Sequence, residues 1–171
     1  TPSGSEGDLR KSLVDLVSGC KKMVVVTTFA SNVARLETII RAGEAAGRKI
    51  VMAGRSLWRI LEAAQASGYL LDIAPIHKPD KIGNIKREKT LVISTGCQGE
   101  PMAATNKMAT NTHPNIRLSP GDTMIFSSKI IPGNEKKIFR LLNQLVSLGI
   151  EVLTEKDHFV HVSGHPSKQE L

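Results

Sequence analysis

Short runs of apolar residues alternate along the chain with longer stretches in which apolar residues recur every three or four positions. The apolar runs cover residues 23–28, 49–53, 91–94, 122–127 and 151–154. They are rich in β-branched residues and are apolar on consecutive positions, a pattern typical of strands buried on both faces of a parallel sheet. The sequence therefore predicts five strands.

The stretches between these runs have the spacing of amphipathic helices. This spacing predicts helices around residues 9–17, 33–43, 57–64 and 138–148. Ser5 and Asp8 stand where a capping pair would begin the first helix, and glycines suited to a helix end follow all four. The segment 72–89 is the least regular, and we expect a short helix or a loop there. Alternating strands and helices predict an α/β fold, a three-layer Rossmann-like domain with a mainly parallel sheet of about five strands and helices on both faces.

Composition fits a globular protein of one domain. The 171 residues are 40% hydrophobic and 23% charged, which is usual for a chain with a packed core. No apolar run approaches the roughly 20 residues that span a bilayer, and the first residues lack the stretches of a signal peptide, so we expect no membrane partner. Cys20 and Cys97 lie in unrelated contexts, which suits free thiols in a reducing compartment. We therefore expect a cytoplasmic protein.

The net charge of +7 and the isoelectric point near 9.6 favour a polyanionic partner. Basic residues gather beside predicted loops, at 78–81, 86–89 and 129–137. A solvated surface and a phosphate-contacting face explain these clusters equally well. Aromatic residues make up only 4% of the chain, which argues against a module that stacks several bases on exposed rings.

Ligands of open α/β sheets gather at the carboxyl ends of the strands. The loops that follow the first four predicted strands contain hydroxyls, glycines and amides, at 27–32, 54–56, 95–101 and 127–135. Their convergence on one edge predicts a phosphate-rich ligand, although Ser31 or Asn32 alone would serve simply to cap a helix. The standard nucleotide-binding glycine patterns are missing, which counts against an autonomous dinucleotide or P-loop enzyme.

The segment 158–167 is the densest polar cluster. His161 and His165 are four residues apart, but Gly164 and Pro166 oppose the helix that would bring both onto one face to hold zinc. No carboxylate set or cysteine pair completes a zinc site. A strand end with hydrogen-bonded histidines remains the simplest alternative.

Seven motifs occur in a characteristic order along the chain. They are Thr-Phe-Ala-Ser-Asn at 28–32, Gly-Arg-Ser at 54–56, Thr-Gly-Cys-Gln-Gly-Glu-Pro-Met at 95–102, Ser-Pro-Gly-Asp-Thr at 119–123, Ser-Ser at 127–128, Ile-Pro-Gly-Asn-Glu at 131–135 and His-Val-Ser-Gly-His at 161–165. Together they resemble the β-CASP domain of the bacterial ribonuclease J family, over essentially the whole chain. The resemblance implies that residues 1–171 are one β-CASP domain, excised from a larger enzyme in which it is inserted into a metallo-β-lactamase core.

In that family the core supplies two zinc ions and hydrolyses RNA by endonucleolytic cuts and by 5′-to-3′ exonuclease action, in RNA processing and decay. This chain lacks the His-x-His-x-Asp-His motif of the core. The resemblance therefore implies a metal-dependent ribonuclease as the parent, no metal ligands within this chain and no activity of the isolated domain. Two positions depart from the family: Cys97 stands where serine is more usual, and Pro166 where a small residue is usual.

The resemblance also assigns roles to single residues. His165 is expected to be catalytic, by stabilising or protonating the leaving oxygen at the scissile phosphodiester. His161, Ser163 and Gly164 resemble the pocket for the RNA 5′-monophosphate or adjacent phosphates. The further RNA- or phosphate-binding candidates are Ser127, Ser128, Gly133, Asn134 and Glu135 in the same cleft, Gly96, Gln98, Gly99 and Glu100 in the loop beside it, and Ser31, Asn32 and Arg35 at the RNA-facing edge.

The expected partners are single-stranded RNA with a 5′-monophosphate and the metallo-β-lactamase core of the same polypeptide. The assembly of the parent stays open between a homodimer and a tetramer. Two alternatives from other classes also remain: a free-standing Rossmann-like module that binds a nucleotide or phosphorylated ligand, and a mainly structural or dimer-forming domain whose loops only cap helices.

Overall fold

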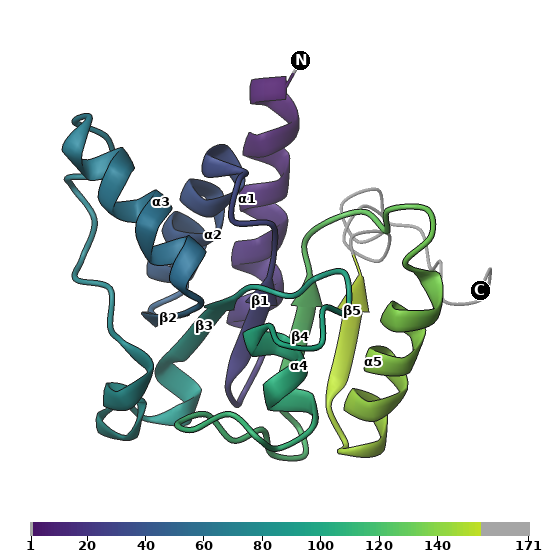
Figure 1. The fold of residues 1–171 in the computed structure, drawn as a ribbon. Helices are drawn as coiled ribbons and strands as arrows, with labels where there is room; N and C mark the ends of the chain where they lie inside the picture. Colours follow the sequence, from purple (N-terminus) through teal and green to yellow (C-terminus); the bar gives the residue numbers. More distant parts are fainter. Residues whose placement is uncertain (1, 155–171) are drawn as a thin grey trace.

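A computed structural model describes residues 2–154, with side chains from residue 6 onward. A five-stranded sheet forms the middle layer, and all four of its strand pairs are parallel, in the order β2-β3-β1-β4-β5 (Figure 1). The strands are β1 (Val24–Thr27), β2 (Lys49–Ala53), β3 (Thr90–Ser94), β4 (Thr123–Phe126) and β5 (Glu151–Thr154). All five lie within or close to the predicted apolar runs.

Helices cover both faces of the sheet. They are α1 (Pro2–Ser18), α2 (Val33–Ala45), α3 (Arg55–Ala66), α4 (Ala104–Ala109) and α5 (Glu135–Ser147), with 3₁₀ turns η1 (Pro79–Asn84) and η2 (Arg87–Lys89). One core cluster joins α1, α2 and α3 to one face of the sheet, and a second joins α4 and α5 to the other. The predicted three-layer α/β fold is confirmed.

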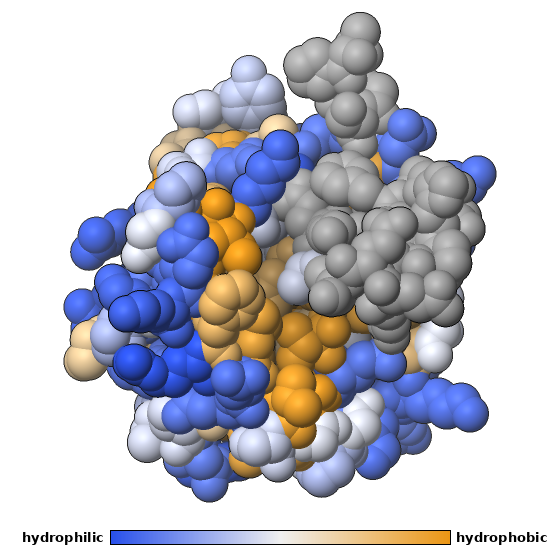
Figure 2. Space-filling view, turned by 90° about the vertical axis from the view of Figure 1, so that its right-hand side faces the viewer, coloured by the Kyte–Doolittle hydropathy of each residue, from blue (hydrophilic) through white to orange (hydrophobic). Residues whose placement is uncertain are grey.

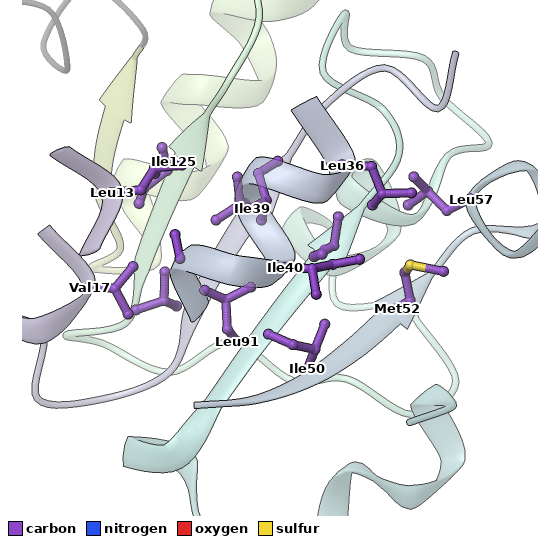
Figure 3. Packing of buried hydrophobic residues seen from close by; sticks show 14 of the residues in the cluster. Leu13, Val17, Leu36, Ile39, Ile40, Ile50, Met52, Leu57, Leu91 and Ile125 are labelled. Atoms are coloured by element: carbon purple, nitrogen blue, oxygen red, sulfur yellow. The ribbon is translucent and has the colours of Figure 1, made fainter. Parts of the chain in front are cut away.

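The alternation of side chains along β1 shows how one strand serves both cores. Val24 and Val26 belong to the cluster beneath α1–α3, whereas Val25 belongs to the opposite cluster. All three are fully buried, which explains why the run is apolar at consecutive positions. Figure 3 shows Ile39 and Ile40 of α2 packed near Leu91 of β3 in the first cluster.

Three details of the sequence prediction change. The capping pair at Ser5 and Asp8 is wrong, because α1 begins at Pro2 and both residues lie inside it; proline is well suited to the first turn of a helix. Helix α4 was missed, because its six residues are too few to show a helical period. The irregular segment 72–89 contains the turns η1 and η2, and His77 forms a parallel bridge with Val51 beside β2.

The predicted ends of the helices are confirmed. Gly47, Gly68 and Gly149 follow α2, α3 and α5 with positive φ angles, the conformation that ends a helix with a glycine. The amide of Gly19 donates to Asp15 at the last turn of α1. Within residues 2–154, no helix is long and apolar enough to cross a membrane.

The outermost strands of the sheet are β2 and β5. On the side of the molecule that holds β5 and α5, apolar side chains reach the surface among hydrophilic ones (Figure 2). Phe139 and Val146 of α5 are the most exposed apolar side chains of that helix. The amphipathic pattern of α5 is therefore incomplete on its outer side.

A buried arginine fixes the amino ends of the strands. Arg48 is 6% exposed, and its guanidinium donates to the carbonyl oxygens of Lys22 at 2.6 Å, Cys20 at 2.8 Å and Thr90 at 3.0 Å. These carbonyls precede β1 or begin β3, so a single side chain, next to β2 in sequence, joins the entry points of three neighbouring strands. A charged donor strengthens such bonds.

We expect Arg48→Met to lower the free energy of unfolding by about 2–4 kcal/mol, because carbonyl groups at a buried junction lose their donor. Urea unfolding followed by circular dichroism measures the change. Arg10→Met is the matched control, since Arg10 is exposed on α1 and should change stability by no more than about 0.5 kcal/mol. Equal effects of the two substitutions would contradict the junction role.

Candidate phosphate-binding edge

The register of the sheet brings four strand ends together. Thr27 at the end of β1 pairs with Ser94 of β3 and with Phe126 of β4, and Ala53 of β2 pairs with Ser94. Neighbouring strands lie about 4.8 Å apart, so the loops that follow β2, β3, β1 and β4 leave the sheet side by side. The convergence predicted from the sequence is therefore present in the fold.

Gln98 joins two of these loops through its buried side chain. The side chain is 4% exposed; its Nε2 donates to the carbonyl of Lys129 at 2.9 Å, and its Oε1 accepts from the amide of Ile131 at 2.9 Å and from Asn134 Nδ2 at 3.2 Å. The loop after β3 thus holds the loop between β4 and α5 in place. The Asn134 side chain makes this contact with Gln98 and forms no capping hydrogen bond to α5.

A close backbone contact reinforces the same junction. Gly99 has a φ of +79°, and a Cβ at this position would lie 2.8 Å from both the carbonyl carbon and the oxygen of Lys137 in α5. Only glycine adopts this backbone conformation without strain, and only glycine has no Cβ that would collide with Lys137. The glycine in the motif is explained by the approach of a helix.

Arg35 of α2 contacts Ser127 at the end of β4. Its guanidinium donates to the Ser127 carbonyl at 3.0 Å and to Ser127 Oγ at 2.9 Å, and it forms an ion pair with Glu6 of α1 at 3.2 Å. Burial raises the pKa of the Glu6 carboxyl, but hydrogen bonds from Thr38 and Arg35 outweigh it and hold that pKa below its usual value. The carboxylate therefore stays charged at neutral pH. This geometry favours a role for Arg35 in positioning Ser127.

Hydroxyl groups form a network beneath the strand ends. Thr105 Oγ1 of α4 lies 2.6 Å from the Thr95 carbonyl, 2.7 Å from Ser94 Oγ and 2.9 Å from Thr27 Oγ1. The single proton of the Thr105 hydroxyl is directed at the Thr95 carbonyl or at Thr27 Oγ1, and Thr105 can accept from Ser94 Oγ. Residues from β1, β3 and α4 are thereby locked together. Thr28 Oγ1 donates to the Ser127 carbonyl at 3.3 Å and adds a link to β4.

Ser128 and Cys97 lie together at the junction of the β3 and β4 loops. The Ser128 hydroxyl oxygen is buried near the Cys97 thiol but makes no hydrogen bond of normal geometry with any described residue. The Cys97 side chain is 2% exposed, and burial raises the pKa of its thiol. Both cysteines are free thiols, as expected.

The other predicted residues of this edge are closer to the surface. Asn32 Oδ1 accepts from the Arg35 amide at 2.9 Å and caps α2, which confirms the capping interpretation of this loop. Ser31 is exposed. Glu135 Oε1 accepts from the Gly133 amide at 2.8 Å, and Glu100 Oε1 accepts from the Gln98 amide at 2.9 Å. The two carboxylates thus stabilise the loops that carry them.

The motif at 119–123 lies at the opposite edge of the sheet. Asp122 is fully buried and accepts from the amides of Met23 at 3.1 Å and Ser119 at 2.7 Å, and it is paired with Arg87. This carboxylate ties the start of β4 to the start of β1. The motif is a structural element of the fold, far along the strands from the loops described above.

The candidates His161, Ser163, Gly164 and His165 lie outside the described residues. Within residues 2–154, no group of three or more histidine, cysteine, aspartate or glutamate side chains is placed to hold a metal ion. The described residues therefore do not fit a zinc centre.

Sequence reasoning assembled most of this edge but missed Thr105. The residue follows the conspicuous glycine-rich loop and resembles an ordinary helix position, so no local signal marked it. Gly96 gives a partial signal: its φ is +106°, and a Cβ there would meet Ala103 at 2.7 Å and Thr105 Cβ at 3.2 Å. The glycine at 96 thus indicates that the segment containing Ala103 and Thr105 folds back against the loop after β3.

Gly99→Ala and Gly133→Ala form a matched pair of substitutions. Both glycines have positive φ, so each substitution should cost about 1–2 kcal/mol of backbone strain. Nothing lies within 4 Å of a Cβ at Gly133, whereas the collision with Lys137 should add roughly 1–3 kcal/mol at Gly99. Urea unfolding of both variants measures the difference. If the two variants lose equal stability, the contact with α5 does not constrain the loop.

Comparison with known proteins identifies the family. The family model described as "Ribonuclease J, beta-CASP domain" matches residues 21–145. The chain is similar to proteins named Ribonuclease J, with 42% identity over 169 residues in Sinorhizobium meliloti, 41% over 172 residues in Corynebacterium glutamicum and 37% over 167 residues in Thermus thermophilus. The alignments cover 99%, 99% and 98% of this chain but only 30%, 24% and 29% of those relatives. The chain belongs to the family of ribonuclease J β-CASP domains.

Proposed function

We propose that this chain is the RNA-clamping β-CASP domain of a metal-dependent ribonuclease that acts on RNA in the cytoplasm. The observation that carries the proposal is the set of loops at the carboxyl edge of the sheet, joined by Gln98 and Arg35, in a chain whose relatives are named Ribonuclease J. The family assignment does not favour the alternative of a free-standing nucleotide-binding module.

The chemistry of this edge suits a phosphate backbone better than a particular base. The residues around Gly133 in the loop before α5 are exposed, and Ser128, at the start of this loop, is partly exposed although its hydroxyl oxygen is buried. Lys129, Lys136 and Lys137 add positive charge beside them. Contacts of this kind hold a strand in register without reading its sequence. His161, Ser163 and Gly164 would complete the grip on a 5′-monophosphate.

The reaction itself requires groups outside this chain. We assign two zinc ions to a metallo-β-lactamase core of the same polypeptide, as membership of the ribonuclease J β-CASP family implies. The zinc centre would supply the activated water for phosphodiester hydrolysis. His165 would reach towards it and protonate the leaving oxygen, a task suited to an imidazole near neutral pH. The parent would then cut RNA both internally and from the 5′ end.

The isolated chain should bind RNA without cleaving it. We expect 5′-monophosphorylated single-stranded RNA to remain intact when it is incubated with the chain and zinc or manganese, as followed by gel electrophoresis. We expect binding, measured by fluorescence anisotropy, to weaken steeply with salt because phosphate contacts release counterions. Metal-dependent turnover by the clean chain would contradict the dependence on a separate core, and salt-independent absence of binding would favour a purely structural domain.

His165→Ala should separate catalysis from binding in the longer protein that carries the core. We expect the rate of cleavage under saturating RNA to fall by about 10²–10⁴-fold, the usual contribution of a general acid, while the Kd for RNA changes by less than about threefold. Single-turnover kinetics and anisotropy measure the two quantities. Lys11→Ala is the control, because Lys11 is exposed on α1, away from the loops of the site, and should change neither quantity. A loss confined to binding would assign His165 to the phosphate grip.

A further inference from the structure

A second cationic site lies at the end of β2, where the loop at 54–56 leaves the sheet. A hollow of about 410 Å³ opens there between the first turns of α3 and the start of η1. It is lined by Met52, Gly54, Arg55, Trp58, Arg59, Glu62, Lys78 and Pro79. The proposed function assigns no role to this hollow.

Main-chain bonds fix the two walls of the hollow relative to each other. The His77 amide donates to Ile50 at 2.8 Å, and the Met52 amide donates to His77 at 3.0 Å, so the segment before η1 runs beside β2 like a further strand. On the other wall, Trp58 Nε1 donates to the Met52 carbonyl at 2.9 Å. Lys78 Nζ consequently lies 5.0 Å from the centre of the Trp58 ring.

The charges in the hollow are unbalanced. Arg55, Arg59 and Lys78 contribute three cations, and Glu62 contributes one carboxylate. None of the three cations forms an ion pair or a side-chain hydrogen bond with another described residue. Arg55 and Arg59 are four residues apart on α3 and therefore lie on the same side of the helix. The hollow thus presents uncompensated positive charge to the solvent.

The neighbourhood of the hollow identifies the kind of anion. Ala53 at its base is in register with Ser94, and Gly54 lies so close to the next loop that a Cβ would meet Thr95 Cγ2 at 2.8 Å. With strands about 4.8 Å apart, the end of β2 is roughly 14 Å from the end of β4. A chain of linked phosphates can contact both places at once, whereas a single phosphate group cannot.

We infer that the hollow around Trp58 is a second contact site for single-stranded RNA, which holds backbone phosphates on Arg55, Arg59 and Lys78 and a neighbouring base on the Trp58 ring. This inference rests on the proposed function and extends it along the strand. Arginine and lysine bind phosphates without sequence preference. Lys78 Nζ lies over the Trp58 ring, so the indole face is open to a base when this ammonium turns to a phosphate. Since Trp58 is the only tryptophan of the chain, one base at most is stacked on an indole.

The test compares two triple variants with equal losses of charge. The first is Arg55→Ala with Arg59→Ala and Lys78→Ala. The control is Lys21→Ala with Lys49→Ala and Lys89→Ala, three exposed residues at the amino ends of β1, β2 and β3, the opposite edge of the sheet. The probes are a 5′-monophosphorylated uridine dinucleotide and a 5′-monophosphorylated oligouridine of about 12 nucleotides. Anisotropy or competition against a labelled strand gives Kd for each.

We expect the first triple variant to bind the oligouridine at least about tenfold more weakly and to lower the slope of log K against log salt by about 2, because three single-strand phosphate contacts are lost. Its affinity for the dinucleotide should stay within about twofold of the unmodified chain. The control should weaken binding of the oligouridine by less than about threefold. Trp58→Leu should weaken oligouridine binding about fivefold or more, and Trp58→Phe should retain most of it.

The outcomes separate this inference from the proposed function. If the unmodified chain binds neither probe, the proposed function fails and the second site fails with it. If it binds both probes and the first triple variant binds the oligouridine as tightly as the control does, only the second site is overturned. Equal losses for the dinucleotide and the oligouridine would also overturn it. Unchanged RNA affinity with weaker association to a separately supplied metallo-β-lactamase core would assign the hollow to a domain contact and overturn the RNA site.

Discussion

Parallel pairing of β1 with β3 on one side and with β4 on the other is the constraint on which the rest of the molecule depends. Because all strands run in one direction, every loop at their carboxyl ends leaves from the same edge. At the amino ends of the strands, Arg48 donates hydrogen bonds to buried carbonyl groups and Asp122 accepts hydrogen bonds from buried amides. The two ends of the sheet therefore differ. At the amino ends of the strands the buried polar groups are hydrogen-bonded within the protein, and at the carboxyl ends several polar groups lie near the surface.

The carboxyl edge is organised by buried side chains. Gln98, in the loop after β3, and Arg35, in α2, each contact main-chain groups of the segment after β4. The loop before α5 is fixed by these side chains and by its own amides, since the Ile131 amide donates to Gln98 and the Gly133 amide donates to Glu135. A phosphate that binds there would meet an arrangement that is already ordered, and little conformational entropy would be lost on binding.

The sequence was sufficient to predict the strands, the main helices and the convergence of loops, because the apolar periods and the terminal glycines are local signals. The sequence could not show which polar residues of a motif form hydrogen bonds that stabilise the fold and which are available to a ligand. Asn134, Glu135 and Asp122 belong to ordered motifs, yet in the structure each stabilises a neighbouring segment. Asn134 contacts Gln98, 36 residues away, and Asp122 also accepts from Met23, 99 residues away, which no period reveals. The contact of Glu135 with Gly133 is local but depends on the conformation of the loop. The role of Thr105 depends on equally distant contacts. The motif residues at 161–165 stay predictions.

The buried thiol of Cys97 can report how often the loops after β3 and β4 separate. Thiol reagents attack the thiolate, and Cys97 is both shielded and held in its protonated form by burial. Its labelling must therefore wait until the loops after β3 and β4 separate, so the labelling rate counts these openings in the unmodified chain. Cys20 is only partly buried and supplies a reference in the same molecule. A ligand that bridges the two loops would slow the reaction of one cysteine and leave the other unchanged.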